Sequence, residues 1–224
     1  MLILGIDTSG KQGSVALARC STDLCEIIEI VELTGGAFSA QLVPRIAALL
    51  SGHALQPKNI DAFAVASGPG SFTGLRVGLA AVKALADVLR VPIAAVSVLE
   101  ALASTGHLAG SVLAALDAGR SQMFVGEYSI ENSPTLTSEQ LLSDEEFVVR
   151  AQNTPVITSD PRVAELARTV QSRVVVADRP RADTIVRQAW MKIAMGETVL
   201  PEILDANYLR RSDAEIFSSK AQPN

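Results

Sequence analysis

Two stretches of this sequence, far apart in the chain, repeat one layout: an apolar run that ends in aspartate, a short polar turn, and a second run that reads as the returning strand. The first is residues 2–8, which contain Asp7, and the second is residues 112–117, which end in Asp117. After each hairpin, apolar strand-like runs alternate with stretches of helical periodicity. Mixed sheets flanked by helices follow from such an order. The sequence therefore predicts an α/β fold that is built twice.

The duplication predicts two lobes. We place the first lobe at residues 1–104 and the second at residues 105–210, and we expect residues 211–224 to form a tail that packs back on the first lobe. Paired lobes with this layout resemble the actin, Hsp70 and sugar-kinase superfamily, whose ASKHA fold is ribonuclease H-like. A chain of 224 residues can bury cores of normal size in both lobes.

The two turns of the repeat are candidate phosphate loops. In that superfamily an aspartate at the end of the first strand faces a metal–phosphate group, and hairpin amides bind the anion. The residues in question are Asp7, Thr8, Ser9, Asp117 and Gly119. The same side chains could equally satisfy ordinary hairpin turns. Activity in the superfamily commonly needs a late glycine pair to hold adenosine, but Gly196 is the only glycine after residue 155, so we expect vestigial loops.

A glycine-rich motif spans residues 68–76, between an expected strand and an expected helix. Backbone amides at such a helix start could bind an anion. The motif is not a P-loop, because the Gly-Lys-Ser/Thr ending is missing. The alternative is a tight turn whose glycines allow close packing.

Two expected helices of the first half, at about residues 39–50 and in the stretch up to Arg90, are apolar on more than one side. Burial under the lobe explains one apolar stripe on each helix, and a contact with another subunit would explain the rest. Burial of both sides within the fold explains the pattern equally well. The residues predicted to form a partner interface are Leu42, Val43, Ile46, Leu49, Phe72, Thr73, Arg76, Val77, Ala81 and Lys83.

Residues for metal or nucleophilic chemistry are sparse. The histidines, His53 and His107, have no cysteine or second histidine near them in sequence, so zinc spacing is missing. No Gly-x-Ser-x-Gly elbow surrounds Ser71. We predict no catalytic residues, no metal and no cofactor. The spacing of Cys20 and Cys25 is neither a redox nor a zinc spacing, and it predicts two reduced cysteines.

Charge and hydropathy limit the partners. A formal net charge of −5 argues against this chain as the main nucleic-acid-binding surface. No apolar run is long enough to span a bilayer, and the first residues read as a strand rather than a signal peptide. We therefore expect a cytoplasmic protein with no membrane contact.

Several motifs resemble one family. Residues 68–78 read Gly-Pro-Gly-Ser-Phe-Thr-Gly-Leu-Arg-Val-Gly, and with residues 4–9, 116–118 and 208–210 they are similar to the TsaB (YeaZ) family. That family is the dimerisation subunit of the bacterial machinery that makes threonylcarbamoyladenosine in tRNA. The resemblance is strong in the first hundred residues and loose between residues 132 and 204.

The resemblance implies a non-catalytic partner of TsaD, the catalytic subunit, with the same actin-like fold. TsaD carries a His-x-x-x-His metal pair, and this sequence has none. The implied partners are TsaD as a heterodimer, the TsaE ATPase, a second copy of the chain when TsaD is absent, and tRNA only indirectly. The alternative is an actin-like ATPase or small-molecule kinase that uses Asp7 and Asp117. A peptidase is a third hypothesis, and no nucleophile–base pair or metal motif in the sequence supports it.

Overall fold

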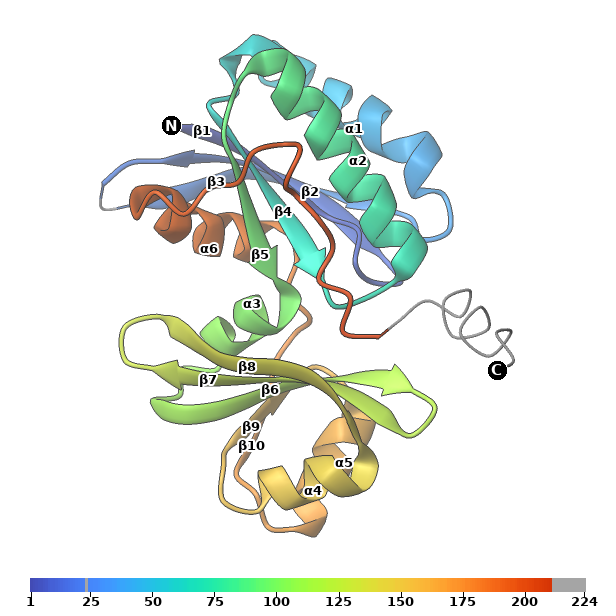
Figure 1. Cartoon of the computed structure of the whole chain (residues 1–224). Coiled ribbons are helices and arrows are strands. Elements are labelled where there is room, and N and C mark those ends of the chain that lie inside the picture. The colour runs from blue at the N-terminus through green and yellow to red at the C-terminus, as the bar shows by residue number, and fades with distance from the viewer. Residues whose placement is uncertain (23, 211–224) are drawn as a thin grey trace, which may run out of the picture.

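The computed structural model describes residues 1–22 and 24–210, and within them it contains two five-stranded sheets, one above the other in Figure 1. The predicted tail at residues 211–224 lies outside the described part. The first sheet has the order β3-β2-β1-β4-β5. Its strands are β1 (Leu2–Asp7), β2 (Gly13–Cys20), β3 (Cys25–Leu33), β4 (Ala62–Gly68) and β5 (Ile93–Ser97).

The second sheet repeats the first, with the order β10-β9-β6-β7-β8. Its strands are β6 (Gly110–Gly119), β7 (Gln122–Ile130), β8 (Pro134–Ser143), β9 (Val156–Thr158) and β10 (Val174–Val176). The central strand of each sheet pairs antiparallel with the next strand in sequence, β2 or β7, and parallel with a later one, β4 or β9. The predicted duplicated ASKHA-type fold is confirmed.

Helices cover both sheets. They are α1 (Phe38–Gly52), α2 (Phe72–Leu89), α3 (Val98–Thr105), α4 (Asp144–Ala151), α5 (Pro161–Thr169) and α6 (Ala182–Ala194), with a short 3-10 turn at Pro57–Asn59. Helices α1 and α2 lie side by side on one face of the first sheet, and α4 and α5 lie beyond the second (Figure 1). Helix α3 lies between the sheets, where one cluster of buried residues includes Ile3 of β1 and Leu116 of β6. The two sheets therefore share a core.

Helix α6 returns to the first sheet. It lies within residues 105–210, the range that the sequence analysis gave to the second lobe, yet it packs on β1, β2, β4 and β5. Gly5 makes this contact possible, because a Cβ there would lie 2.3 Å from Val186 Cγ2 and 2.8 Å from the Ala182 carbonyl oxygen. The residues that follow α6 also return, since Leu204 is buried in the core of the first lobe.

The prediction of two reduced cysteines is wrong for this structure. Cys20 and Cys25 face each other at the end of the β2–β3 ladder, with Cα atoms 3.9 Å apart, and their sulfurs are bonded. Strand register, rather than sequence spacing, brings the two thiols together. Within the described residues, no helix combines the length and hydropathy that a membrane crossing needs.

Candidate functional site: the cleft between the lobes

An open cleft of about 1530 Å³ lies between the lobes. The turn after β1, residues 7–13 (the first turn), and the turn after β6, residues 117–122 (the second turn), both contribute to its wall. The glycine-rich motif and residues 207–210 line it as well. The fold therefore brings Asp7 and Asp117 to the same cleft, as the repeat predicted.

In the first turn, Asp7 is buried and its carboxylate accepts a hydrogen bond from the backbone. Its Oδ1 accepts a hydrogen bond of 2.8 Å from the Ser9 amide. Burial raises the pKa of Asp7 above its ordinary value, while the hydrogen bonds from Ser9 and the charge of Arg179 act in the opposite direction. The Thr8 hydroxyl donates to the Gly74 carbonyl at 2.7 Å. Both side chains therefore hold the turn in place.

The glycines of the motif allow helix α2 to pack closely against the first turn. A Cβ at Gly70 would lie 2.3 Å from the Ser9 carbonyl oxygen, and a Cβ at Gly74 would lie 2.1 Å from the Thr8 carbonyl oxygen. The Ser71 amide donates to the Ser9 carbonyl at 2.7 Å. The Ser71 hydroxyl caps the helix by accepting from the Gly74 amide at 3.2 Å. This geometry supports the close-packing interpretation of the motif.

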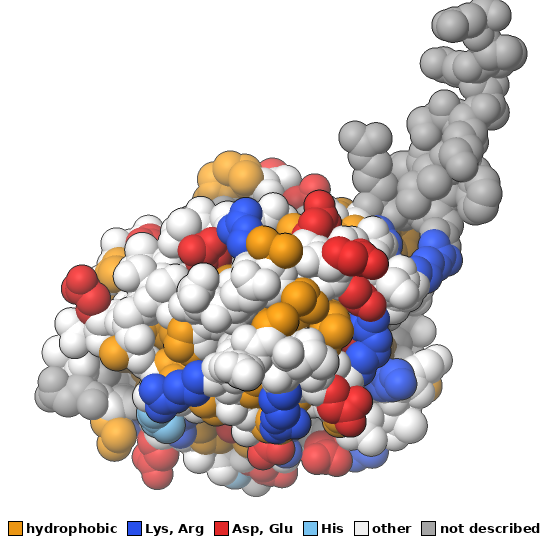
Figure 2. All heavy atoms as spheres, turned by 90° about the horizontal axis from the view of Figure 1, so that it is seen from below, with side chains coloured by type: hydrophobic (Ala, Val, Ile, Leu, Met, Phe, Trp, Pro, Cys, Tyr) orange, Lys and Arg blue, Asp and Glu red, His pale blue; other side chains and the backbone are white. Residues whose placement is uncertain are grey.

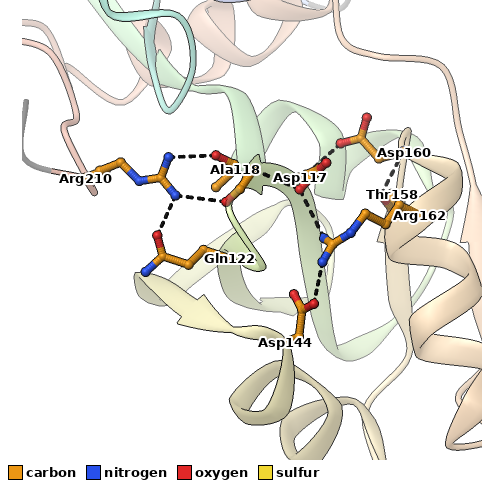
Figure 3. A network of polar contacts seen from close by, with 9 residues as sticks. Asp117, Ala118, Gln122, Asp144, Thr158, Asp160, Arg162 and Arg210 are labelled. Atoms are coloured by element: carbon orange, nitrogen blue, oxygen red, sulfur yellow. Dashed lines mark hydrogen bonds and ion pairs between the residues drawn. The ribbon is translucent and has the colours of Figure 1, made fainter. Parts of the chain in front are cut away.

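The second turn repeats the aspartate-to-amide hydrogen bond of the first turn. Asp117 Oδ1 accepts from the Gly119 amide at 2.9 Å, as Asp7 does from the amide of the second residue after it. The same carboxylate oxygen lies 3.1 Å from the Arg162 guanidinium, which also pairs with Asp144 (Figure 3). The Asp117 amide donates to Asp160 at 2.8 Å. The charge of Asp117 is therefore already paired within the chain.

Arg210 reaches the second turn from the side opposite Arg162 (Figure 3). It donates to the Ala118 carbonyl at 2.8 Å, the Gly119 carbonyl at 3.2 Å and the Gln122 side chain at 2.6 Å. The sequence analysis noted residues 208–210 only as a family motif and predicted no contact for them. Their partners are remote in sequence, so no local pattern could have indicated these bonds.

Residues 205–210, here called the closing segment, also hold the first lobe. The Asn207 amide donates to the Ser67 carbonyl of β4 at 2.7 Å. The Tyr208 ring lies 5.1 Å from the Phe72 ring, and its hydroxyl accepts from Arg76 Nε at 3.2 Å. Arg76 in turn stacks on Phe72, 3.7 Å from the ring centroid. The closing segment thus connects the start of α2 to the second turn.

A carboxylate that the sequence analysis missed joins the lobes beside the cleft. Glu139 of β8 accepts hydrogen bonds from Ser97, from the Tyr128 hydroxyl and from the Asn207 side chain. Burial and the nearby charge of Glu139 raise the pKa of Tyr128 above its ordinary value. Strand β8 was not predicted from the sequence, so nothing placed Glu139 at the lobe junction.

Other chemistry-bearing side chains lie apart from one another. Among the described residues, no three His, Cys, Asp or Glu side chains are grouped as a metal site would require. His53 pairs with Glu29 at 2.7 Å on the surface of the first lobe. Of the aspartates that line the cleft, Asp7 and Asp117 are used as turn acceptors, and Asp117 is also ion-paired. The arrangement offers little to bind a metal-bound phosphate at the second turn.

The residues predicted for a partner interface fall into two groups. Leu42, Ile46 and Leu49 are 1%, 6% and 3% exposed and belong to the core of the first lobe, so they present no surface to a partner. Burial within the fold, the alternative from the sequence, accounts for these three. Val43 is 57% exposed. Of the others, Thr73 and Arg76 are exposed, while Phe72, Val77, Ala81 and Lys83 are half-buried.

The outward side of α1 and α2 is nevertheless apolar. Small or apolar residues recur there at helical spacing, and we call this set the outer face. Its members are Ala40, Val43, Pro44 and Ala47 of α1, and Thr73, Val77, Ala80, Ala84 and Val88 of α2. All are exposed except the half-buried Val77, and Val88 is 79% exposed. The sequence analysis did not single out most of these, because periodicity alone does not say which stripe faces the sheet.

The face of the molecule seen from below in Figure 2 has a different character. Acidic, basic and apolar side chains are interspersed across the described residues on it. A mixed surface of this kind lacks the clustering of lysine and arginine that marks a nucleic-acid footprint.

Comparisons with known proteins agree with the sequence motifs. The family model "TsaD: tRNA N6-adenosine threonylcarbamoyltransferase" matches residues 31–180. The tRNA threonylcarbamoyladenosine biosynthesis protein TsaB of Haemophilus influenzae is 31% identical over 166 residues, which cover 68% of this chain and 69% of that protein. The chain belongs to the TsaB (YeaZ) family. The predicted resemblance is confirmed.

Two further family members are similar. TsaB of Bacillus subtilis is 36% identical over 150 residues, covering 66% of this chain. That match spans 63% of the Bacillus protein, less than two thirds of its length. The solved structure of YeaZ from Pseudomonas aeruginosa superposes with a TM-score of 0.77 at 27% identity, over 93% of this chain and 99% of that one. The fold described above is therefore the fold of the family.

Proposed function

We propose that this chain is a non-catalytic subunit that binds and stabilises TsaD during threonylcarbamoyl transfer to tRNA adenosine, and that the outer face of α1 and α2 is the contact surface. Family membership supports the pathway, since relatives in Bacillus subtilis and Haemophilus influenzae are named as tRNA threonylcarbamoyladenosine biosynthesis proteins. The observation that carries the proposal is the outer face itself.

The outer face fits a helix-to-helix contact. Small side chains at Ala40, Ala47, Ala80 and Ala84 let a second pair of helices approach closely. Contiguous exposed apolar surface on a soluble chain marks an interaction site. The half-buried residues Val77 and Ala81 lie at its edge and pack on the core, so the face is held rigid from beneath.

The state of the cleft supports a non-catalytic role. Arg162 neutralises Asp117, and Arg210 occupies the carbonyls beside it. An ATPase or small-molecule kinase would need that carboxylate free to act on a metal–phosphate group. These internal bonds weigh against the alternative hypothesis, in which Asp7 and Asp117 act together.

The other partners are those that the family resemblance implies. A second copy of the chain presents the same helices, so we expect a homodimer when TsaD is absent. We place TsaE in the assembly as a further subunit, and we expect tRNA to be contacted through TsaD, because this chain has a net charge of −5.

Two matched valines test the interface. Val43→Glu places a charge on the outer face, whereas Val149→Glu places the same charge on α4 at a similarly exposed valine; the wild-type exposures are 57% and 65%. We expect Val43→Glu to weaken TsaD binding by about tenfold or more, because a buried unpaired carboxylate is costly. Calorimetric titration with TsaD measures the effect. Equal affinities of the two variants would mean that the outer face is not the contact surface.

A further inference from the structure

The apolar outer face of α1 and α2 has charged side chains along its edges. The charged residues of the two helices are Arg45 of α1 and Arg76, Lys83 and Asp87 of α2. Asp87 is paired at 2.9 Å with Arg90, which directly follows α2. The other three form no ion pair with any described residue. The unpaired charges of the two helices are therefore all positive.

Arg45 lies along the edge of the face that is remote from α2. It is exposed, and it comes one helical turn after Gln41, so the two side chains share one side of α1. The Gln41 side chain accepts a hydrogen bond of 3.0 Å from the amide of Thr34, which follows β3. Strand β3 is the edge of the first sheet farthest from β4, on which α2 packs. This side of α1 therefore faces away from α2.

Arg76 and Lys83 lie along the opposite edge of the face. Arg76 donates to the Tyr208 hydroxyl of the closing segment, which runs beside α2 on the side that α1 does not cover (Figure 1). Lys83 follows Arg76 by two helical turns, so it shares this side of α2. Arg76 is exposed and Lys83 is half-buried. Cations thus border the apolar face on both sides.

Nearby carboxylates leave these cations unpaired. Glu202 and Asp205 are exposed on the stretch of chain that returns to the first lobe, but neither forms an ion pair with Arg76 or Lys83. Asp205 instead accepts a hydrogen bond of 2.8 Å from the amide of the next residue. The chain as a whole has a net charge of −5, so its composition does not explain a positive border here.

A second copy of the chain matches this border poorly. In a contact with two-fold symmetry the same surface lies on both sides, so the borders that meet are both positive. The carboxylate of Asp87, which could offset them, is already paired with Arg90. Like charges across an interface disfavour a partner, whereas opposite charges at its rim speed association and favour the matching partner.

We propose that Arg45, Arg76 and Lys83, here called the cationic rim, select a partner whose facing surface carries carboxylates and disfavour a second copy of this chain. The inference rests on the proposed function, because it takes the outer face as the contact surface. It adds the chemistry of the partner surface, which has small or apolar residues along its middle and acidic residues at both edges. We expect TsaD from the same organism to present this pattern.

The double variant Arg45→Glu/Lys83→Glu converts the full chain into a partner of that chemistry. It reverses one charge on each edge of the face and leaves the bond from Arg76 to Tyr208 in place. A second variant, Arg45→Gln/Lys83→Gln, removes the same charges without reversing them. Thermal unfolding of each variant, compared with wild type, shows that it is folded before binding is measured.

The control carries the same change in net charge at a distant place. Arg168 of α5 and Arg173, which directly precedes β10, are exposed on the second lobe and form no ion pair with a described residue. The control variant is Arg168→Glu/Arg173→Glu. Any effect of net charge alone should appear equally in this variant and in Arg45→Glu/Lys83→Glu.

Calorimetry measures binding to TsaD, binding of variant to wild-type chain, and dissociation of the wild-type chain from itself on dilution. We expect Arg45→Glu/Lys83→Glu to bind TsaD about tenfold or more weakly than wild type, with a smaller loss for the glutamine variant. The glutamate variant should bind the wild-type chain about threefold or more tightly than the wild type binds itself. The control should match wild type in both. Raising the salt from about 0.05 to 0.5 M should weaken wild-type binding to TsaD.

The outcomes separate this proposal from the proposed function. If Val43→Glu weakens TsaD binding but Arg45→Glu/Lys83→Glu does not, the outer face is the contact surface and the cationic rim does not select the partner. A mixed pair of variant and wild-type chain that is no tighter than the wild-type pair would also overturn the proposal, and so would TsaD binding that is insensitive to salt. If neither variant changes TsaD binding, the outer face is not the contact surface, and both proposals fail.

Discussion

At the scale of single residues, the two halves of the chain preserve one bond and differ in what surrounds it. Asp7 and Asp117 each accept from the amide of the second residue after it, at 2.8 and 2.9 Å. Asp7 is buried, whereas Asp117 is exposed and paired with Arg162. The sequence repeat predicted the equivalence of the two positions. It could not predict their environments, because Arg162 and Arg179 come from distant elements.

The buried Asp7 predicts a pH-dependent difference in stability. Its pKa is raised from an ordinary value of 3.8, so the folded state holds the proton more tightly than the unfolded state. Asp7 therefore lowers wild-type stability progressively as pH rises from about that ordinary value through the raised folded-state pKa. Asp7→Asn cannot ionise and should not suffer this loss.

We accordingly expect the stability of Asp7→Asn, measured relative to wild type by chemical denaturation, to improve as pH rises from about 4 to 7. A stability difference that does not change with pH would mean that the pKa of Asp7 is not raised in the folded state. A difference in which Asp7→Asn becomes less stable than wild type as pH rises would mean the same. Pairing with TsaD should be unaffected, because Asp7 is only 3% exposed and presents almost no surface to a partner.

At the scale of elements, local sequence signals predicted most strands and helices. They missed the features that depend on packing between distant parts of the chain. The capping box of α4, Ser143 with Glu146, is formed as its sequence indicates. Strand β8 was missed because its side chains are mostly half-buried or exposed and carry no clear alternation. For α1 and α2, the sequence identified an excess of apolar residues but could not assign the buried stripe, so Leu42, Ile46 and Leu49 were placed at an interface that their burial excludes.

The contact between α2 and the first turn predicts an asymmetry between two helical glycines. Gly74→Ala would bring a Cβ to 2.1 Å from the Thr8 carbonyl oxygen, whereas a Cβ at Gly52 of α1 meets no atom within 4 Å. We expect Gly74→Ala to cost about 1–3 kcal/mol of unfolding free energy, because the helix must move off the turn.

Gly52→Ala should be neutral or slightly stabilising, since alanine reduces the entropy of the unfolded chain. Urea denaturation of both variants measures the difference. Similar stabilities would mean that the glycine motif is not needed for close packing.

At the scale of the whole molecule, the chain closes on itself. Helix α6 and the closing segment return to the first lobe. Asn207 bonds to both lobes, through Ser67 and Glu139, and Arg210 bonds to the second turn. The sequence predicted two lobes from the repeat. It could not predict the return of α6, because a helix with an apolar stripe fits either sheet.

The closing segment predicts a long-range effect. Arg210→Ala removes three hydrogen bonds to the second turn. We expect a loss of about 1–3 kcal/mol in unfolding free energy and faster amide hydrogen exchange at residues 117–122. Arg90→Ala, at an arginine whose side chain is 81% exposed, serves as the control and should change neither. Unchanged exchange in the second turn of Arg210→Ala would contradict the bridging role of the segment.

The central claim is that this chain acts by binding TsaD. Light scattering coupled to size exclusion tests it most directly, with the purified chain alone and mixed with TsaD from the same organism. We predict that the chain alone runs as a homodimer, and that the mixture gives a stable species with the mass of a complex containing both proteins. A mixture that elutes as the two separate components would contradict the proposed function.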